Sequence, residues 1–173
     1  TGDWSSDVCS SDLLGLYQKL DLPLPWKPAT SPIPLLIYGG ASAVGAFAIK
    51  LAHLSNIHPI ITVAGNGIPF VEKLIDSTKG DVIIDYREGS DTVISKIREA
   101  AATAGKPIEH ALDAVSETPT FEIIKQVIDQ KTGKLTTVLP DDTQAPEGSQ
   151  IQVTRTMVRS EEHTSELQSP VLS

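Results

Sequence analysis

Short apolar runs alternate with amphipathic segments along the middle of this chain, and each change of pattern marks an expected strand or helix. Residues 33–38 form a compact apolar run with Pro34 near its start and a Gly-Gly pair after it, which predicts a strand buried on both faces. Residues 43–54 then repeat apolar side chains at helical spacing, so we expect a helix directly after the glycines.

The same alternation continues along the chain. We expect strands at residues 59–64, 82–84, 108–112 and 133–139, and helices at residues 14–22, 70–77, 92–104 and 119–128. Residues 151–158 begin a further strand. Strands that alternate with helices at this spacing favour a parallel sheet with helices on both faces, because right-handed crossovers place them there. The predicted class is α/β with a doubly wound parallel sheet.

The two ends of the chain differ from the middle. Residues 159–169 can be encoded by DNA that resembles a sequencing-library adapter, and its reverse complement, shifted by one base, encodes residues 3–13. Selection for folding does not produce such a relation. We therefore expect residues 1–13 and 159–173 to be artefactual or disordered tails around a domain at residues 14–158. The alternative is genuine Ser-rich and acidic tails, which would also be disordered.

Composition excludes several classes of protein. The chain is 40% hydrophobic and 21% charged, which is typical of a globular domain. It contains neither an apolar run long enough for a membrane span nor a secretory leader, so we expect a soluble cytoplasmic protein. The formal net charge of −8 argues against DNA and RNA as partners. Cys9 is the only cysteine, which excludes an intramolecular disulfide.

The turn between the first strand and its helix carries the strongest chemical signal. From its second glycine it reads G-x-S-x-x-G, a variant of the dinucleotide-binding fingerprint, in which glycines permit a tight turn and close helix packing. Unpaired N–H groups at the helix start attract phosphate. An ordinary glycine-rich turn is the alternative, whereas a nucleophile elbow and a P-loop lack their required residues. The predicted phosphate-binding residues are Gly39, Gly40, Ala41, Ser42, Ala43, Val44 and Gly45.

Five ordered motifs carry a resemblance to a known family. They read YGGASAVGAFAIKLA, IITVAGNG, DVIIDYREG, ALDAVSE and GKLTTVLP. Together they resemble the Rossmann-type NAD(P)-binding domain of medium-chain dehydrogenase/reductases, especially fungal quinone-oxidoreductase-like and trans-enoyl-reductase-like proteins. The resemblance covers nearly all of residues 14–158 and implies a domain that is incomplete at its C-terminus. In full-length relatives a GroES-like barrel supplies much of the substrate cleft, so we expect this chain alone to be inactive.

The cofactor expected from these residues is NADPH, with NADH less favoured. NAD-preferring folds place an acid after the second strand, where this chain has Gly65 and Asn66, so nothing there repels a 2′-phosphate. The resemblance implies that Tyr86 contacts the adenosine phosphate or ribose and that Val115 and Leu139 line the nicotinamide channel. The alternatives are a surface tyrosine and two core residues at strand ends.

No residue stands out as a catalytic acid, base or nucleophile. His53, His58 and His110 are scattered without metal-ligand spacing, so we expect neither zinc nor another metal in this part of the protein. The resulting hypothesis is an NADPH-dependent oxidoreductase with a small-molecule substrate, and with homo-oligomers as in many relatives. A dinucleotide-binding module without turnover is the alternative. A methyltransferase is disfavoured because it usually has an acid after the second strand.

Overall fold

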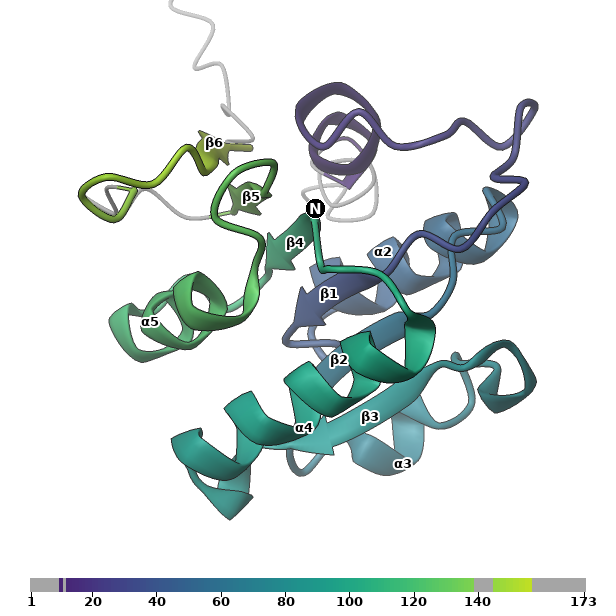
Figure 1. Ribbon diagram of the computed structural model, residues 1–173. Helices are drawn as coiled ribbons and strands as arrows, with labels where there is room; N and C mark the ends of the chain where they lie inside the picture. Colours follow the sequence, from purple (N-terminus) through teal and green to yellow (C-terminus); the bar gives the residue numbers. More distant parts are fainter. Residues whose placement is uncertain (1–9, 11, 139–144, 157–173) are drawn as a thin grey trace, which may run out of the picture.

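The computed structural model describes residues 10, 12–138 and 145–156 of the 173-residue chain. Its centre is a six-stranded parallel sheet in the order β3-β2-β1-β4-β5-β6 (Figure 1). This is the strand order of the doubly wound dinucleotide-binding fold, so the predicted fold class is confirmed. The strands are β1 Leu35–Tyr38, β2 Ile60–Ala64, β3 Val82–Asp85, β4 His110–Asp113, β5 Lys134–Thr137 and β6 Gln152–Arg155.

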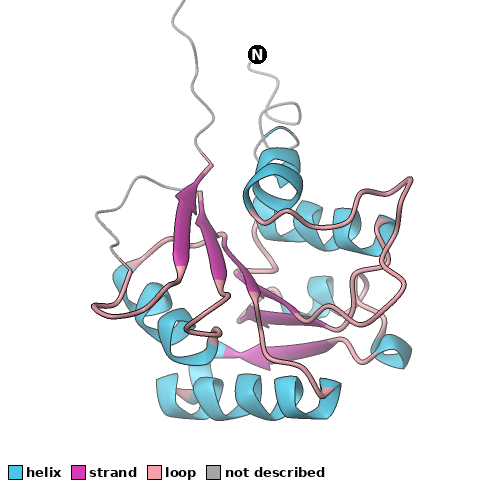
Figure 2. Ribbon diagram, turned by 45° about the horizontal axis from the view of Figure 1, so that its top comes forward, coloured by secondary structure: helices cyan, strands magenta, loops and turns pink. Residues whose placement is uncertain are grey.

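Helices cover both faces of the sheet (Figure 2). None of the helices among the described residues has the length and apolar character that a membrane span requires. The α-helices are α2 Ala43–Leu54, α3 Ile68–Val71, α4 Ser90–Ala104 and α5 Thr118–Val127. The short helices are the π-helical η1 Leu14–Lys19 and the 3₁₀ turns η2 Ser77–Lys79 and η3 Tyr86–Glu88.

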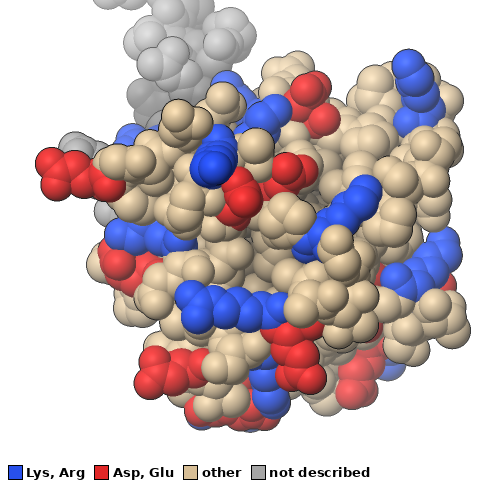
Figure 3. Space-filling view, viewed as in Figure 1, with Lys and Arg blue, Asp and Glu red and all other residues tan. Residues whose placement is uncertain are grey.

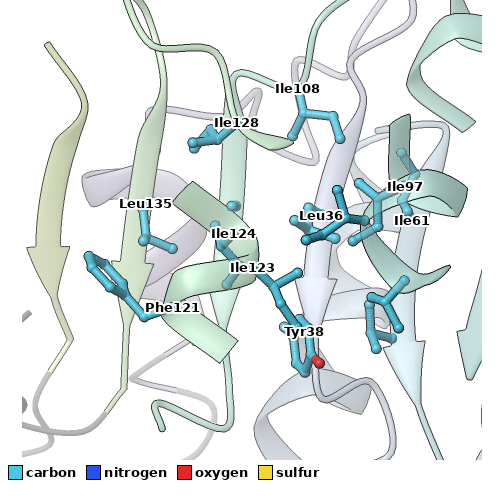
Figure 4. Packing of buried hydrophobic residues seen from close by; sticks show 14 of the residues in the cluster. Leu36, Tyr38, Ile61, Ile97, Ile108, Phe121, Ile123, Ile124, Ile128 and Leu135 are labelled. Carbon is cyan, nitrogen blue, oxygen red and sulfur yellow. The ribbon is translucent and has the colours of Figure 1, made fainter. Parts of the chain in front are cut away.

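The side chains of the central strand β1 point alternately into two layers of the hydrophobic core, one on each face of the sheet. Leu36 and Tyr38 pack into the layer under α4 and α5 (Figure 4), whereas Leu35 and Ile37 pack into the layer under η1 and α2. Because successive strand residues point to opposite faces, a strand with both faces covered must be apolar throughout. All four residues of β1 are buried, as the apolar run in the sequence predicted.

The predicted helix at residues 70–77 is wrong in its extent. The α-helix α3 ends at Val71, and the chain bends into turns before η2. The backbone N–H of Asp76 donates to Oδ2 of Asp81 at 2.9 Å, a bond to the start of β3 that a continued helix would break. The N–H of Asp76 is therefore bonded to a buried carboxylate, a partner that no local pattern of apolar residues indicates.

A candidate dinucleotide-binding site

The turn after β1 is tight because two glycines allow backbone to approach backbone. Gly39 has φ +92°, a conformation that favours glycine, and a Cβ added there would lie 2.7 Å from Cγ2 of Val115. A Cβ on Gly45 would overlap the carbonyl oxygen of Gly39 and lie 2.8 Å from its carbonyl carbon. The first turn of α2 therefore rests directly on the end of β1, which is the packing expected from the fingerprint.

Ser42 caps α2. Its side-chain oxygen accepts a hydrogen bond from the N–H of Gly45 at 3.0 Å, and its hydroxyl donates to the carbonyl oxygen of Gly39 at 2.8 Å. The sequence analysis placed Ser42 among the phosphate-binding residues, and in the structure its hydroxyl caps the helix.

Backbone N–H groups remain free at the start of α2. Among the described residues, the amides of Ala43 and Val44 have no hydrogen-bond acceptor, as expected for the first residues of a helix. The helix dipole adds a partial positive charge at the same place. Since the helix begins beyond the carboxyl end of β1, between β2 and β4, these donors lie where the strand order reverses. This geometry suits an anionic phosphate.

The loops after β2 and β3 meet beside this turn. A Cβ on Gly65 would overlap the ring of Tyr86, so the tyrosine ring lies directly on the glycine backbone. A Cβ on Gly67 would overlap Cβ of Ala41, which brings the loop after β2 against the phosphate-binding turn. Tyr86 stays half exposed. The structure thus joins residues from three strand ends that the sequence predicted separately.

Arg87 adds a positive charge to this edge. Its Nε and one terminal nitrogen donate to the carboxylate of Asp85, and its other terminal nitrogen donates to Oδ1 of Asn66 at 2.8 Å. The hydrogen bonds from the Arg87 side chain are the main reason why the pKa of Asp85 falls from 3.8 to about 2. The carboxylate is therefore charged and paired, and the guanidinium is fixed next to the loop after β2.

Asp113 organises the loop after β4, and the sequence analysis missed it. Its Oδ1 accepts hydrogen bonds from the N–H groups of Val115 at 3.0 Å and Ser116 at 2.7 Å, and its Oδ2 accepts one from the Thr120 hydroxyl at 2.8 Å. The side chain is fully buried, and burial raises its pKa despite these bonds. An Asp at a strand end, two and three residues before the amides that it binds, is the signal of an Asx turn.

Val115 thereby packs against Gly39 and borders the turn on the β4 side. Leu139, the other predicted neighbour of the nicotinamide, lies outside the described residues. Within those residues, the one group of three His, Cys, Asp or Glu side chains close enough to share a metal ion lies near the amino ends of the strands, away from this site. The predicted residues of the loops after β1, β2, β3 and β4 therefore gather at one edge of the sheet.

Comparisons with known proteins agree with this geometry. No protein-family model matches the chain. Over 127 residues it is 48% identical to the trans-enoyl reductase fsr4 of Gibberella fujikuroi, a match that covers 72% of this chain and 37% of that protein. The chain thus spans about a third of the length of these curated trans-enoyl reductase relatives.

Solved structures share the fold. The mitochondrial 2-enoyl thioester reductase heterodimer of Candida tropicalis superposes with a TM-score of 0.64 at 17% identity, over 88% of this chain and 42% of that one. The alcohol dehydrogenase of Thermus sp. ATN1 superposes with a TM-score of 0.66 at 16% identity, over 89% of this chain and 42% of that one. Sequence relatives, fold and glycine turn agree, and the chain belongs to the medium-chain dehydrogenase/reductase superfamily.

Proposed function

We propose that this chain is the nucleotide-binding part of an NADPH-dependent oxidoreductase. In the full-length protein it would serve hydride transfer to an activated carbon–carbon double bond or a quinone-like carbonyl. The observation that carries this proposal is the turn at residues 39–45, whose free amides at the start of α2 lie at the switch point of the sheet. The relatives named trans-enoyl reductase support the double bond as the reacting group.

The residues fit a nicotinamide dinucleotide along the carboxyl edge of the sheet. The amides of Ala43 and Val44 would bind the pyrophosphate, because the residues before them, Ala41 and Ser42, have small side chains and glycines flank the turn. Tyr86, lying on Gly65, would border the adenosine. When bound, the dihydronicotinamide supplies the hydride, and the protein orients it.

Arg87 supports NADPH over NADH. The guanidinium has five N–H groups. Three of them donate to Asp85 and Asn66, which leaves two for a phosphate on the adjacent ribose. No acidic residue lies in the loop of residues 65–67, where a carboxylate would favour the free ribose hydroxyls of NADH. Asp85 is held by Arg87, so its charge is already compensated.

Calorimetric titration of the 173-residue chain with NADPH, NADH and S-adenosylmethionine tests the proposal. We expect NADPH to bind most tightly. Arg87→Ala should weaken NADPH binding about tenfold and leave NADH binding unchanged, because one charged hydrogen bond to the 2′-phosphate contributes about 1.5 kcal/mol. Lys131→Ala, which removes an exposed charge from a distant turn, is the matched control. Equal affinity for both dinucleotides would refute the NADPH assignment, and failure to bind either would refute the site.

Catalysis and partners belong to the full-length protein. Oxidation of NADPH with an enoyl substrate there distinguishes a working reductase from a dinucleotide-binding module without turnover. We propose a small molecule as the substrate, and no nucleic acid. In support, Lys and Arg side chains are interspersed with Asp and Glu over the face shown in Figure 3, whereas a phosphate backbone requires clustered basic residues.

A further inference from the structure

A second group of reactive side chains lies at the opposite edge of the sheet. His53 lies near the end of α2, His58 lies two residues before β2, and Asp81 directly precedes β3. One ligand atom from each of the three residues lies within 4.8 Å of the others. Because His58 and Asp81 lie near the amino ends of their strands, this cluster is separate from the dinucleotide site.

We propose that His53, His58 and Asp81 form a binding site for a divalent transition metal ion, with zinc the best match. Two imidazoles and one carboxylate are the ligand types that Zn²⁺ uses in three-residue sites, with a fourth position left for water or another oxygen. The softness of imidazole favours Zn²⁺, Co²⁺ and Ni²⁺ over Mg²⁺ and Ca²⁺, which prefer all-oxygen sites.

The distances between the ligand atoms lie on either side of the spacing that a tetrahedral zinc ion requires. Nδ1 of His58 lies 2.7 Å from Oδ1 of Asp81, and Nε2 of His53 lies 3.8 Å from Oδ2 of Asp81. With bonds of about 2.0–2.1 Å, ligand atoms around a tetrahedral zinc lie about 3.3 Å apart. Measured to the two oxygens of the carboxylate, the first distance must widen and the second must shorten by about half an ångström each, and ligand atoms up to 4.8 Å apart must approach one another.

The surroundings hold the carboxylate in place. Oδ1 of Asp81 also accepts the N–H of Ile60 at 2.7 Å, and Oδ2 accepts the N–H of Asp76 at 2.9 Å, so backbone donors orient this ligand from both sides. Such outer contacts are typical of metal-binding carboxylates. The side chain of Asp81 is fully buried and that of His58 nearly so, whereas the His53 side chain is 26% exposed and leaves a route for the ion.

His58 has an unsatisfied ring nitrogen in the present arrangement. Its Nδ1 donates to Asp81, and its Nε2 is buried with no hydrogen-bond partner among the described residues. Coordination through Nδ1 moves the proton to Nε2, and Nε2 lacks a partner in either tautomer, so the tautomer change adds little cost. His53 now donates from Nε2 to the carbonyl oxygen of Leu74 at 2.6 Å, and coordination frees that oxygen as a candidate fourth ligand.

A bound ion would cross-link the end of α2 to the residues just before β2 and β3. An ion that binds only the folded state stabilises it in proportion to the logarithm of its concentration above Kd. Because this metal site lies near the amino ends of the strands, metal binding should leave the affinity for dinucleotides unchanged. Failure of this inference is therefore distinguishable from failure of the proposed function.

The test measures zinc binding by the 173-residue chain in a Cys9→Ser background, so that the single thiol cannot supply a ligand. Competition titration with a chromophoric zinc chelator gives Kd and stoichiometry, and visible absorption of bound Co²⁺ reports tetrahedral geometry. We expect one zinc per chain, a rise in melting temperature with Zn²⁺ but not Mg²⁺, and unchanged NADPH binding.

Variants identify the ligands. His53→Gln retains a donor for Leu74, so the fold should survive, and we expect it to weaken zinc binding at least about tenfold. His110→Gln removes an imidazole outside the cluster and should bind zinc like the parent chain. Zinc binding no stronger than magnesium binding, or an unchanged affinity in His53→Gln, would show that the three residues form only a structural hydrogen-bond network.

Discussion

Gly45→Ala tests whether the contact between α2 and the turn after β1 creates the phosphate site. The added methyl would overlap the carbonyl oxygen of Gly39 and lie 2.8 Å from its carbonyl carbon and 2.9 Å from Cα of Gly40. Carbon atoms pack at about 3.5 Å or more, so the helix start must withdraw by at least about 0.7 Å. All the atoms in the way are backbone, so no side chain can rotate to make room.

The expected cost has three parts. Overpacking of this kind costs about 1–3 kcal/mol. Withdrawal also lengthens the 3.0 Å cap bond from Gly45 to Ser42, which contributes about 1 kcal/mol. Alanine recovers about 1 kcal/mol through its higher helix propensity. We therefore expect a net loss of about 2 kcal/mol in the free energy of unfolding.

We expect Gly45→Ala to weaken NADPH binding by more than its loss of stability would explain. Displaced amides lose alignment with the phosphate, and one charged hydrogen bond contributes about 1.5–3 kcal/mol, so the Kd for NADPH should rise at least about tenfold. Urea unfolding and calorimetric titration measure the two effects. Lys50→Gly, an exposed position in the same helix, should cost about 1 kcal/mol of stability and leave Kd unchanged. Wild-type affinity in Gly45→Ala would refute the reasoning.

Three further predictions concern single side chains. Ser42→Ala should lower the free energy of unfolding by about 1 kcal/mol through loss of the cap but change the Kd for NADPH less than about threefold. Thr120→Val leaves buried Oδ2 of Asp113 without its hydroxyl donor and should cost about 2 kcal/mol in urea unfolding. Asp12 lies in the segment that the sequence analysis expected to be an artefactual or disordered tail, but the structure buries it. It is 1% exposed with no hydrogen-bond partner among the described residues, and burial raises its pKa from 3.8 to about 8. The stabilising contribution of protonated Asp12 is complete below about pH 4 and disappears as pH rises through 8. We therefore expect the free energy of unfolding to increase by about 2 kcal/mol when the pH falls from 8 to 6.5.

Each of these predictions has a clear contrary result. A tenfold loss of affinity in Ser42→Ala would make the hydroxyl a phosphate ligand. Thr103→Val, on the exposed face of α4, is the control for Thr120→Val, and equal costs would contradict the role of Asp113. Asp12→Asn should remove most of the pH dependence above pH 6.5, and an unchanged slope would assign it to another group. Below that pH, His110 acts in the opposite direction, because burial lowers its pKa.

Much of the fold follows from local patterns. The helix at residues 43–54 has the predicted bounds, and every predicted strand is present among the described residues, with ends shifted by a few residues. Apolar runs and helical spacing are local properties, and burial in a sheet covered on both faces produces them directly. The path of the chain between α3 and β3 was not predictable, because the N–H of Asp76 binds a buried carboxylate that lies five residues later in the chain.

The candidate site divides in the same way. The sequence alone determined the glycine turn and the helix start that follows it, because the tight turn, the cap and the free amides all lie within seven consecutive residues. Only the tertiary structure decided which distant groups meet there. Tyr86 packs on Gly65, Val115 packs against Gly39, and Arg87 donates a hydrogen bond to Asn66.

The tertiary structure also brought His53, His58 and Asp81 together, although their spacing in the sequence shows no metal-binding pattern. The physical reason is that a parallel sheet aligns strand ends separated by a whole helix, so residues 20 to 75 positions apart become neighbours. Nothing local in the sequence encodes that alignment.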